Sequence, residues 1–240
     1  MSDGLGESIK VIDACDLDDE LRTLLKPGEM LLDEQKRRHR LPRYFYEVPS
    51  HEAAQAIRLT PHFGLNEFIL VDLREAERLQ QFPRYIPCAV RVLAFYLEQF
   101  RAAAGASVHV AVNGGYRSPM HKMSTHATPH MWGTAADVYR IGATILKTKD
   151  TIEKFNEVAE GVSDDIVVYP FGHVTGNTAD DHVHVDLGYI TVVPREISED
   201  RMEVPQEARP RFAFEDRRRR ERRAGDDVGR ASARPDETTG

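Results

Sequence analysis

Histidine and aspartate are concentrated in one short segment of the chain, DDHVHVDLG at residues 180–188. Side chains alternate between the two faces of a β-strand, so His182, His184 and Asp186 share one face and the valines between them share the other. A half-buried strand needs only the apolar face to pack. A single histidine at such a position is more often a core residue than a ligand, but two histidines beside carboxylates leave core packing and metal binding both open.

A second pair of ligand-type residues, His130 and Asp137, lies in TPHMWGTAADV at residues 128–138. The small residues between them give a path by which a loop can enter a strand and bring an imidazole and a carboxylate to one point. Spacing alone fixes nothing in three dimensions, but together with His184 the pair supplies two nitrogens and one oxygen. A zinc ion held by three protein ligands keeps its fourth position for water, so this donor set has the composition of a catalytic metal site.

Four segments resemble segments of a known family and occur along this chain in the same order as in that family. HMWGTAADV resembles the HxxGxAxD motif of the zinc-dependent D-alanyl-D-alanine carboxypeptidases and peptidoglycan endopeptidases, whose fold is shared with the hedgehog signalling domain. GYRSP at 115–119 is similar to a segment of that family. HVHVDLG and LTPHFGLNEF resemble the end and the start of one of its branches. The similarity extends from about residue 59 to residue 190.

The resemblance implies an α+β fold with an antiparallel sheet flanked by helices, of the hedgehog/DD-peptidase type. It implies that His130, Asp137 and His184 bind Zn²⁺, and that Arg117 lies in the cleft and pairs with a substrate carboxylate or carbonyl. The planar guanidinium suits this role because it meets a carboxylate with two parallel hydrogen bonds. The alternative for Arg117 is a structural arginine that satisfies turn carbonyls near Gly114 and Gly115.

The catalytic base has two candidates. Many members of the family place a glutamate three residues before the last zinc ligand, where this chain has the shorter Asp181. The related HxH arrangement assigns proton transfer to its first histidine, here His182. We favour His182, with Asp181 as its orienting partner or as a substitute base. Two further histidines nearby, His121 and His126, are expected to face solvent from a loop.

The resemblance implies a zinc metallopeptidase that hydrolyses amide bonds in peptidoglycan-type peptides containing D-amino acids. A non-catalytic, zinc-stabilised module that binds cell-wall peptides is the alternative, favoured by Asp181 and by Lys122, which stands where the family commonly has asparagine. A non-haem iron oxygenase is disfavoured because no histidine follows His184 to complete a facial triad. A cupin is disfavoured because no glutamate follows HVH within a few residues.

The elements expected to position these residues are helices first and hairpin-connected strands later, which predicts an α+β fold with an antiparallel sheet. An apolar stripe predicts a helix over 86–105, with Pro87 in its first turn and Gly105 at its end. A further helix is expected over 150–161, with Asp150 and Glu153 at capping-box spacing. Strands are expected in SVHVAV, VYRIGATIL, IVVYPFG and HVHVDLGYITVV.

Composition divides the 240 residues into three parts: a helical N-terminal extension at 1–57, the peptidase-like domain at 58–200, and a charged tail at 201–240. The tail contains RRRRERR at 217–223 but few apolar residues. It is therefore expected to be a solvated, disordered segment. An electrostatic contact of the tail with an anionic polymer or surface is the alternative.

Several classes of protein are excluded or disfavoured. No apolar run is long enough for a membrane helix, and a net charge of −7 argues against nucleic acid as a general partner. Cys15 and Cys88 lack CxxC spacing, so neither a disulfide framework nor a thiolate zinc site is expected. The first residues lack the pattern of a secretory signal, which predicts a cytoplasmic location. A wall substrate would then be reached by non-classical export or release by lysis.

Overall fold

The computed structural model describes residues 9–173 and 181–195 of the chain. The chain divides into two units, Met1–Arg195 and Glu196–Gly240. The second unit lies outside the described residues, and with it the predicted tail at 201–240 and its arginine-rich run.

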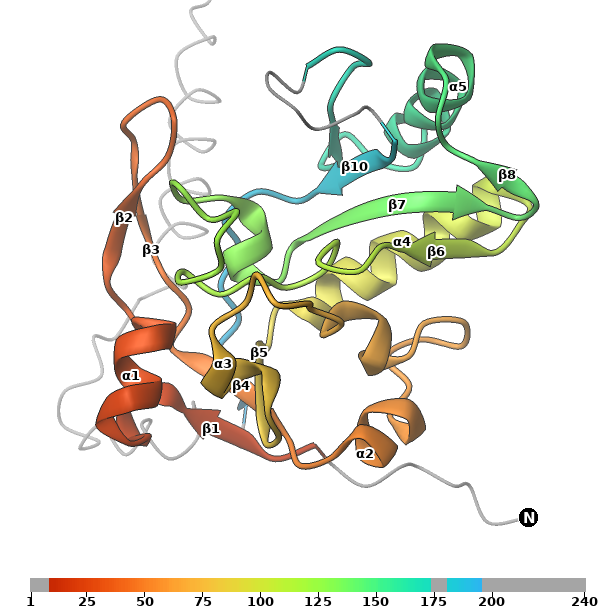
Figure 1. Ribbon diagram of the computed structural model, residues 1–240. Helices are drawn as coiled ribbons and strands as arrows, with labels where there is room; N and C mark the ends of the chain where they lie inside the picture. Colours follow the sequence, from red (N-terminus) through yellow and green to blue (C-terminus); the bar gives the residue numbers. More distant parts are fainter. Residues whose placement is uncertain (1–8, 174–180, 196–240) are drawn as a thin grey trace, which may run out of the picture. The chain divides into compact units, whose positions relative to one another are not determined.

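An antiparallel sheet in the second half of the first unit carries the candidate site (Figure 1). Its strands follow the spatial order β6-β7-β10-β9, and β8 pairs with the end of β7. The pairing of β7 with β10 places Val183 opposite Val138, and Val185 opposite Ala136, with all four side chains fully buried. The bounds are β6 Val108–Val110, β7 Ala135–Ile141, β8 Thr144–Ile145, β9 Val167–Val168 and β10 Val183–Asp186.

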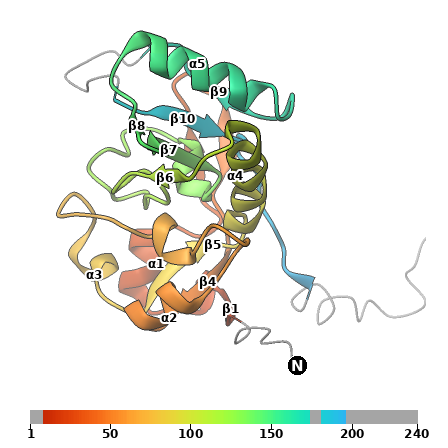
Figure 2. The same ribbon diagram turned by 90° about the vertical axis from the view of Figure 1, so that its right-hand side faces the viewer.

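Two helices pack on this sheet, α4 (Val90–Ala104) against β7, and α5 (Lys149–Glu160) against β9 and β10. Figure 2 shows α4 running beside the strands. The predicted stripe of Val90, Leu93, Leu97 and Phe100 is fully buried. Gly105 ends α4 in the left-handed conformation at φ 62°, as expected for a glycine that terminates a helix.

A second sheet has the order β1-β4-β5 and is also antiparallel. Its strands are β1 Val11–Asp13, β4 Tyr44–Val48 and β5 Arg84–Pro87. The remaining helical elements of this half are η1 Ala14–Asp16, α1 Asp19–Leu25, α2 His51–Ala56, η2 Leu65–Phe68 and α3 Glu77–Gln80.

A two-stranded hairpin, β2 (Met30–Leu32) and β3 (Arg38–Arg40), supports the 3-10 helix η3 (Pro129–Trp132). The indole nitrogen of Trp132 donates to the carbonyl of Arg40 at 3.1 Å, and the backbone N–H of Ala127 donates to the carbonyl of Leu32 at 2.8 Å. Trp132 is fully buried in a cluster with Leu41, Ala127 and Met131. The hairpin therefore fixes the segment that carries His130.

The molecule is thus a mixed fold of helices and antiparallel sheets, as the α+β prediction expected. The described residues contain no helix with the length and apolar character of a membrane span. Cys15 and Cys88 are both thiols.

The expectation that residues 1–57 are helical is wrong for most of the part that the structure describes, because residues 9–57 contain four strands and only short helices. The reason lies in the run Tyr44-Phe45-Tyr46, whose aromatic side chains favour a pleated surface. This run forms β4, which pairs with β5. Strand β4 therefore connects the predicted extension to the rest of the unit.

Two helix starts also differ from expectation. Pro87 is the last residue of β5, where Pro87 pairs with Phe45, and α4 begins at Val90. Thr148, rather than Asp150, caps α5, since its hydroxyl accepts the N–H of Thr151. Proline tolerates a strand end as well as a first helical turn, and several polar residues near Thr148 have cap chemistry, so sequence does not separate these choices.

Candidate metal centre

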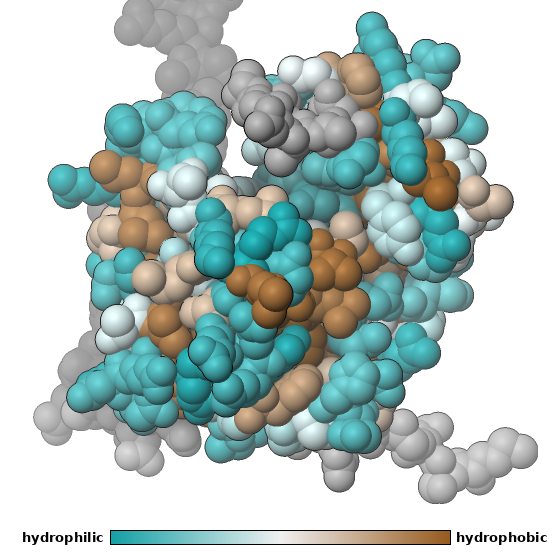
Figure 3. All heavy atoms as spheres, in the orientation of Figure 1, coloured by the Kyte–Doolittle hydropathy of each residue, from teal (hydrophilic) through white to brown (hydrophobic). Residues whose placement is uncertain are grey.

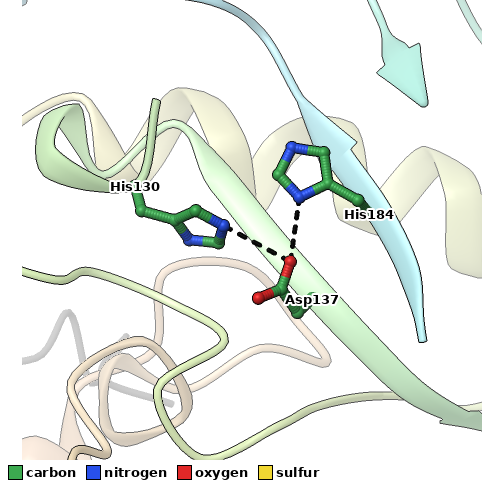
Figure 4. Close-up of side chains that lie close together, drawn as sticks. All are labelled: His130, Asp137 and His184. Atoms are coloured by element: carbon green, nitrogen blue, oxygen red, sulfur yellow. Dashed lines mark hydrogen bonds and ion pairs between the residues drawn. The ribbon is translucent and has the colours of Figure 1, made fainter. Parts of the chain in front are cut away.

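Strand register brings His184 and Asp137 together. The two residues are direct partners in the antiparallel pairing of β10 with β7. Directly opposite residues point to the same face of a sheet. Nδ1 of His184 lies 2.8 Å from Oδ1 of Asp137 (Figure 4). Asp186 lies two residues further along this face and opposite the small Ala135.

His130 reaches the same point from η3. Pro129 occupies the first position of this turn, and Gly133 ends it at φ 68°, a left-handed conformation that suits glycine. The chain then enters β7 at Ala135. Nε2 of His130 lies 3.3 Å from Oδ1 of Asp137.

The hydrogen bond at the far side of the His130 ring fixes its protonation. Nδ1 lies 2.8 Å from the carbonyl oxygen of Gly115, which can only accept, so Nδ1 carries the proton and Nε2 presents its lone pair. Gly115 is close enough to the backbone of Phe68 that a Cβ would collide with it. Nε2 of His130 is buried and makes no hydrogen bond. An unpartnered, buried lone pair directed at a carboxylate and a second imidazole is the arrangement expected of a metal ligand.

His184 is held on three sides. Its Nε2 lies 3.0 Å from Oδ2 of Asp186, and the ring of Tyr169 stacks on it at 4.4 Å with an interplanar angle of 2°. Tyr169 in turn stacks against His173 at 4.4 Å. These contacts leave Nδ1 directed toward Asp137. A histidine that donates its outer nitrogen to a carboxylate is typical of metal sites.

The charged groups of the cluster shift the pKa values of one another. Burial acts to lower the pKa of His184, but the hydrogen bonds that its ring donates to the carboxylates of Asp137 and Asp186 outweigh burial and raise the pKa to about 9. Burial, and next Arg117, lower the pKa of His130 to about 4. Burial acts to raise the pKa of Asp137, but its contacts with His130, His184 and Arg117 hold it well below its usual range. A histidine ligates only as neutral imidazole, so a metal ion here would replace the proton on His184.

The three predicted ligands therefore form a buried group that could hold a metal ion. One ligand atom from each of His130, Asp137 and His184 lies within 4.8 Å of the others. Ligand atoms about 2 Å from a tetrahedral zinc are separated by about 3.3 Å, and the contacts of 2.8 and 3.3 Å from the two imidazoles to Asp137 are close to this separation.

Arg117 lies beside this group. Its buried guanidinium donates from Nη2 to Oδ2 of Asp137 at 3.2 Å and from Nη1 to the sulfur of Met123 at 3.8 Å. Its backbone N–H donates to the carbonyl of His130. The arginine thus occupies one carboxylate oxygen of Asp137 and leaves the other directed at both imidazoles. Its predicted pairing with a substrate stays a prediction.

The two candidate bases lie next to each other at the edge of the group. Nε2 of His182 is 3.6 Å from Oδ1 of Asp137, and its Nδ1 is 2.8 Å from Oδ1 of Asp181. His182 is half-buried, whereas the side chain of Asp181 is 62% exposed. This geometry brings His182 closer to the predicted ligands and makes Asp181 its hydrogen-bond partner.

The expected solvent exposure of His121 is wrong. This side chain is buried, and its Nε2 lies 3.0 Å from Oδ1 of Asn113. It stabilises the loop after β6, since Asn113 also accepts the N–H of Asp72. His126 is partly exposed and lies 3.5 Å from Glu34.

Glu75 and Tyr169 contact residues of the site, Glu75 through Ser118 and Tyr169 through His184, but no motif or spacing in the sequence indicates either of them. Glu75 is buried and accepts both the backbone N–H and the hydroxyl of Ser118, the neighbour of Arg117, at 3.0 and 2.6 Å. Asp186 is the one residue supporting His184 that the sequence pattern indicates, because its period-two spacing places it on the same strand face as His184.

Comparison with known proteins gave no assignment: no family model, no curated protein and no solved structure matches the chain.

Proposed function

We propose that this protein is a zinc-dependent metallopeptidase that hydrolyses amide bonds in peptidoglycan-type peptides containing D-amino acids. In this proposal it is a divergent member of the zinc D-alanyl-D-alanine carboxypeptidase and peptidoglycan endopeptidase family, with the hedgehog/DD-peptidase fold. The observation that carries the proposal is the convergence of His130, Asp137 and His184, three residues singled out by motif, with the lone pair of His130 Nε2 unpartnered.

Zinc fits the donor set better than a hard cation does. Two imidazoles and one carboxylate suit a borderline-soft ion, whereas magnesium and calcium prefer oxygen ligands. When bound, zinc lowers the pKa of a water ligand toward about 7 and polarises a carbonyl oxygen. The carbonyl of Gly115 accepts from His130 and the carboxylate of Asp186 accepts from His184, so both imidazoles are already held in orientation.

The proton transfer that hydrolysis requires falls to His182. The Asp181 carboxylate fixes the proton on Nδ1 of His182, so Nε2 presents its lone pair toward Asp137. Nε2 can therefore take a proton from the attacking water and pass it to the leaving amine. Arg117 supplies a fixed cation beside the ligands, which steadies a carboxylate or carbonyl of the peptide.

Two variants test the assignment. The purified chain is expected to bind about one Zn²⁺, and His184→Ala to abolish both metal binding and hydrolysis because it removes a ligand. His182→Ala is expected to keep its zinc and to lose roughly 10²- to 10⁴-fold in turnover, the usual contribution of a general base. Zinc content is measured by atomic emission. Products from intact sacculi and from free D-Ala-ended peptides are identified by mass spectrometry. Full zinc occupancy in His184→Ala would show that this ligand is misassigned.

A second candidate function is a metal-stabilised module that binds wall peptides without cleaving them. It is favoured by the exposure of Asp181, which is also one methylene shorter than the glutamate that many members of the family have at this position. Complete zinc loading and saturable binding to sacculi, with no product from either substrate, would select this function over the enzyme.

A further inference from the structure

Exposed hydrophobic side chains gather beside the candidate metal centre. Figure 3 shows hydrophobic residues collected in the middle of one face of the molecule. Five side chains on the two loops at residues 69–76 and 111–125 are 37–82% exposed, and Leu73 is the most exposed. We refer to these five as the apolar rim: Leu70, Leu73, Val112, Met120 and Met123.

Hydrogen bonds hold the two loops of the apolar rim together. The backbone N–H of Asn113 donates to the carbonyl of Leu70 at 2.8 Å, and that of Lys122 donates to the carbonyl of Arg74 at 2.9 Å. The bonds from Ser118 to Glu75 join the same two loops. Hydrophobic residues from distant parts of the sequence are thus fixed on one surface.

The apolar rim is continuous with the candidate metal centre through Met123. The sulfur of Met123 accepts from Nη1 of Arg117 at 3.8 Å and from Nη1 of Arg74 at 3.3 Å. Arg117 donates from its other terminal nitrogen to Asp137. A ligand group that reaches Arg117 therefore lies next to the Met123 side chain.

Folding does not explain the exposure of these residues. Isolated exposed hydrophobic residues are ordinary, but a group on two adjoining loops next to a candidate site indicates a binding surface. Methionine is flexible and polarisable, so two methionines can adapt to aliphatic groups of different shape. Arg117 at one end favours an anionic or carbonyl group, and the rim favours a hydrocarbon group beside it.

We propose that the apolar rim is a subsite for an aliphatic side chain on the peptide residue whose carboxylate or carbonyl lies at Arg117. This inference rests on the proposed function, because it specifies which peptides that function acts on. Peptides with an aliphatic residue at this position bind more tightly than peptides with an acidic one.

The test uses two probes that differ in one side chain, acetyl-D-alanyl-D-leucine and acetyl-D-alanyl-D-glutamate. Both are titrated into the zinc-loaded full chain carrying His182→Ala, so that the peptide is not consumed. The chain has six methionines, and ¹³C-methyl labelling with Met120→Leu and Met123→Leu assigns the two in the rim. The leucine peptide is expected to bind roughly tenfold more tightly, since each buried methylene contributes about a fourfold gain. Its binding is expected to shift the Met123 signal.

In Leu73→Ser and in Met123→Ser, the affinities for the leucine peptide and the glutamate peptide are expected to differ by no more than about twofold. Such exposed positions seldom affect folding. Ile145→Ser is the matched control, because Ile145 is 51% exposed on β8 and lies outside the apolar rim. This variant should keep the preference for the leucine peptide over the glutamate peptide. Equal affinity for the two peptides, no binding of either, or a preference retained in both rim variants would overturn the subsite.

The subsite and the proposed function fail in different ways. If only the subsite is wrong, zinc-dependent hydrolysis of D-Ala-ended peptides persists with no side-chain preference. If only the peptidase assignment is wrong, leucine-selective binding and the Met123 shift persist and no peptide is cleaved.

Discussion

At the scale of single residues, each imidazole of the candidate centre presents one nitrogen to Asp137 while its other nitrogen is hydrogen-bonded elsewhere. His130 uses the carbonyl of Gly115, and His184 uses the carboxylate of Asp186. Asp186 also accepts the backbone N–H of Gly188 at 2.7 Å, which fixes its own orientation. Asp186 therefore orients His184, and it would do so without contacting a metal ion bound between His130, Asp137 and His184.

Replacing Asp186 with asparagine tests this role. The amide keeps the volume of the side chain but removes the negative charge that would make His184 a stronger ligand for a bound metal ion. Loss of such a partner ordinarily weakens metal affinity roughly 10- to 100-fold. Competition with a chromophoric zinc chelator measures the affinity directly.

Asp181→Asn is the matched control for Asp186→Asn. Its carboxylate contacts His182 and is largely exposed, so the zinc affinity of this variant should stay within about twofold of the wild type. If Asp186→Asn binds zinc as tightly as the control does, the orienting role of Asp186 is refuted.

Sequence predicted the ligand types at this site but not the geometry that makes them effective. The motif spacing selected His130, Asp137 and His184, which do converge. Two features lay beyond prediction because they depend on tertiary structure. One is the strand register that pairs His184 with Asp137, and the other is the backbone carbonyl of Gly115 that sets the His130 tautomer.

At the scale of elements, Glu98 attaches the turn before η2 to α4. Its carboxylate accepts from the Thr60 hydroxyl at 2.8 Å, the His62 ring at 2.6 Å and the Arg101 guanidinium at 2.8 Å. Burial acts to raise the pKa of Glu98, but hydrogen bonds from Arg101, Thr60 and His62 outweigh it and lower the pKa to about 2. The ionised carboxylate therefore stabilises the folded state.

The stabilisation by Glu98 should depend on pH. Because its pKa is lower in the folded state than the usual 4.5, the contribution is complete above about pH 4.5 and is lost as the pH falls toward 2. Glu98→Gln should lower the free energy of unfolding by about 1.5–3 kcal/mol at pH 7, the usual value of hydrogen bonds to a charged group. The difference from the wild type should shrink steadily in urea denaturation from pH 5 to pH 3.

Glu153→Gln, on the exposed face of α5, is the control for Glu98→Gln. Its carboxylate lies 3.6 Å from Lys149 and is 45% exposed, so little change in stability is expected. A deficit in Glu98→Gln that is the same at pH 5 and pH 3 would mean that the lost contacts do not depend on the charge.

The sequence pattern predicted the elements whose signals lie within one segment. It did not predict elements that form only by pairing with distant strands. The stripe of α4 and its terminal Gly105 were predicted because both signals lie within one helix. Strand β4 was missed because a three-residue aromatic run becomes a strand only by pairing with β1 and β5. The cap of α5 was misplaced because Thr148 and Asp150 have the same capping chemistry.

At the scale of the whole molecule, the candidate ligands at positions 130, 137 and 184 come from three elements, η3, β7 and β10. No pair of them is close enough in sequence to form a tight site in an unfolded chain. A metal ion bound here would therefore bind the folded state almost exclusively, and its binding free energy would add to the stability of the fold.

Metal removal should consequently lower the thermal stability of the protein. With free zinc a thousandfold above Kd, binding contributes about 4 kcal/mol, and each kcal/mol shifts Tm by about 2–4 °C for a chain of this size, so a loss of roughly 8–16 °C is expected on chelation. Differential scanning fluorimetry with excess zinc and with EDTA measures the shift. His184→Ala should show no zinc-dependent difference, because the ligand that joins β10 to the site is absent. Equal Tm values for the wild type in zinc and in EDTA would show that the three residues pack together without binding a metal ion.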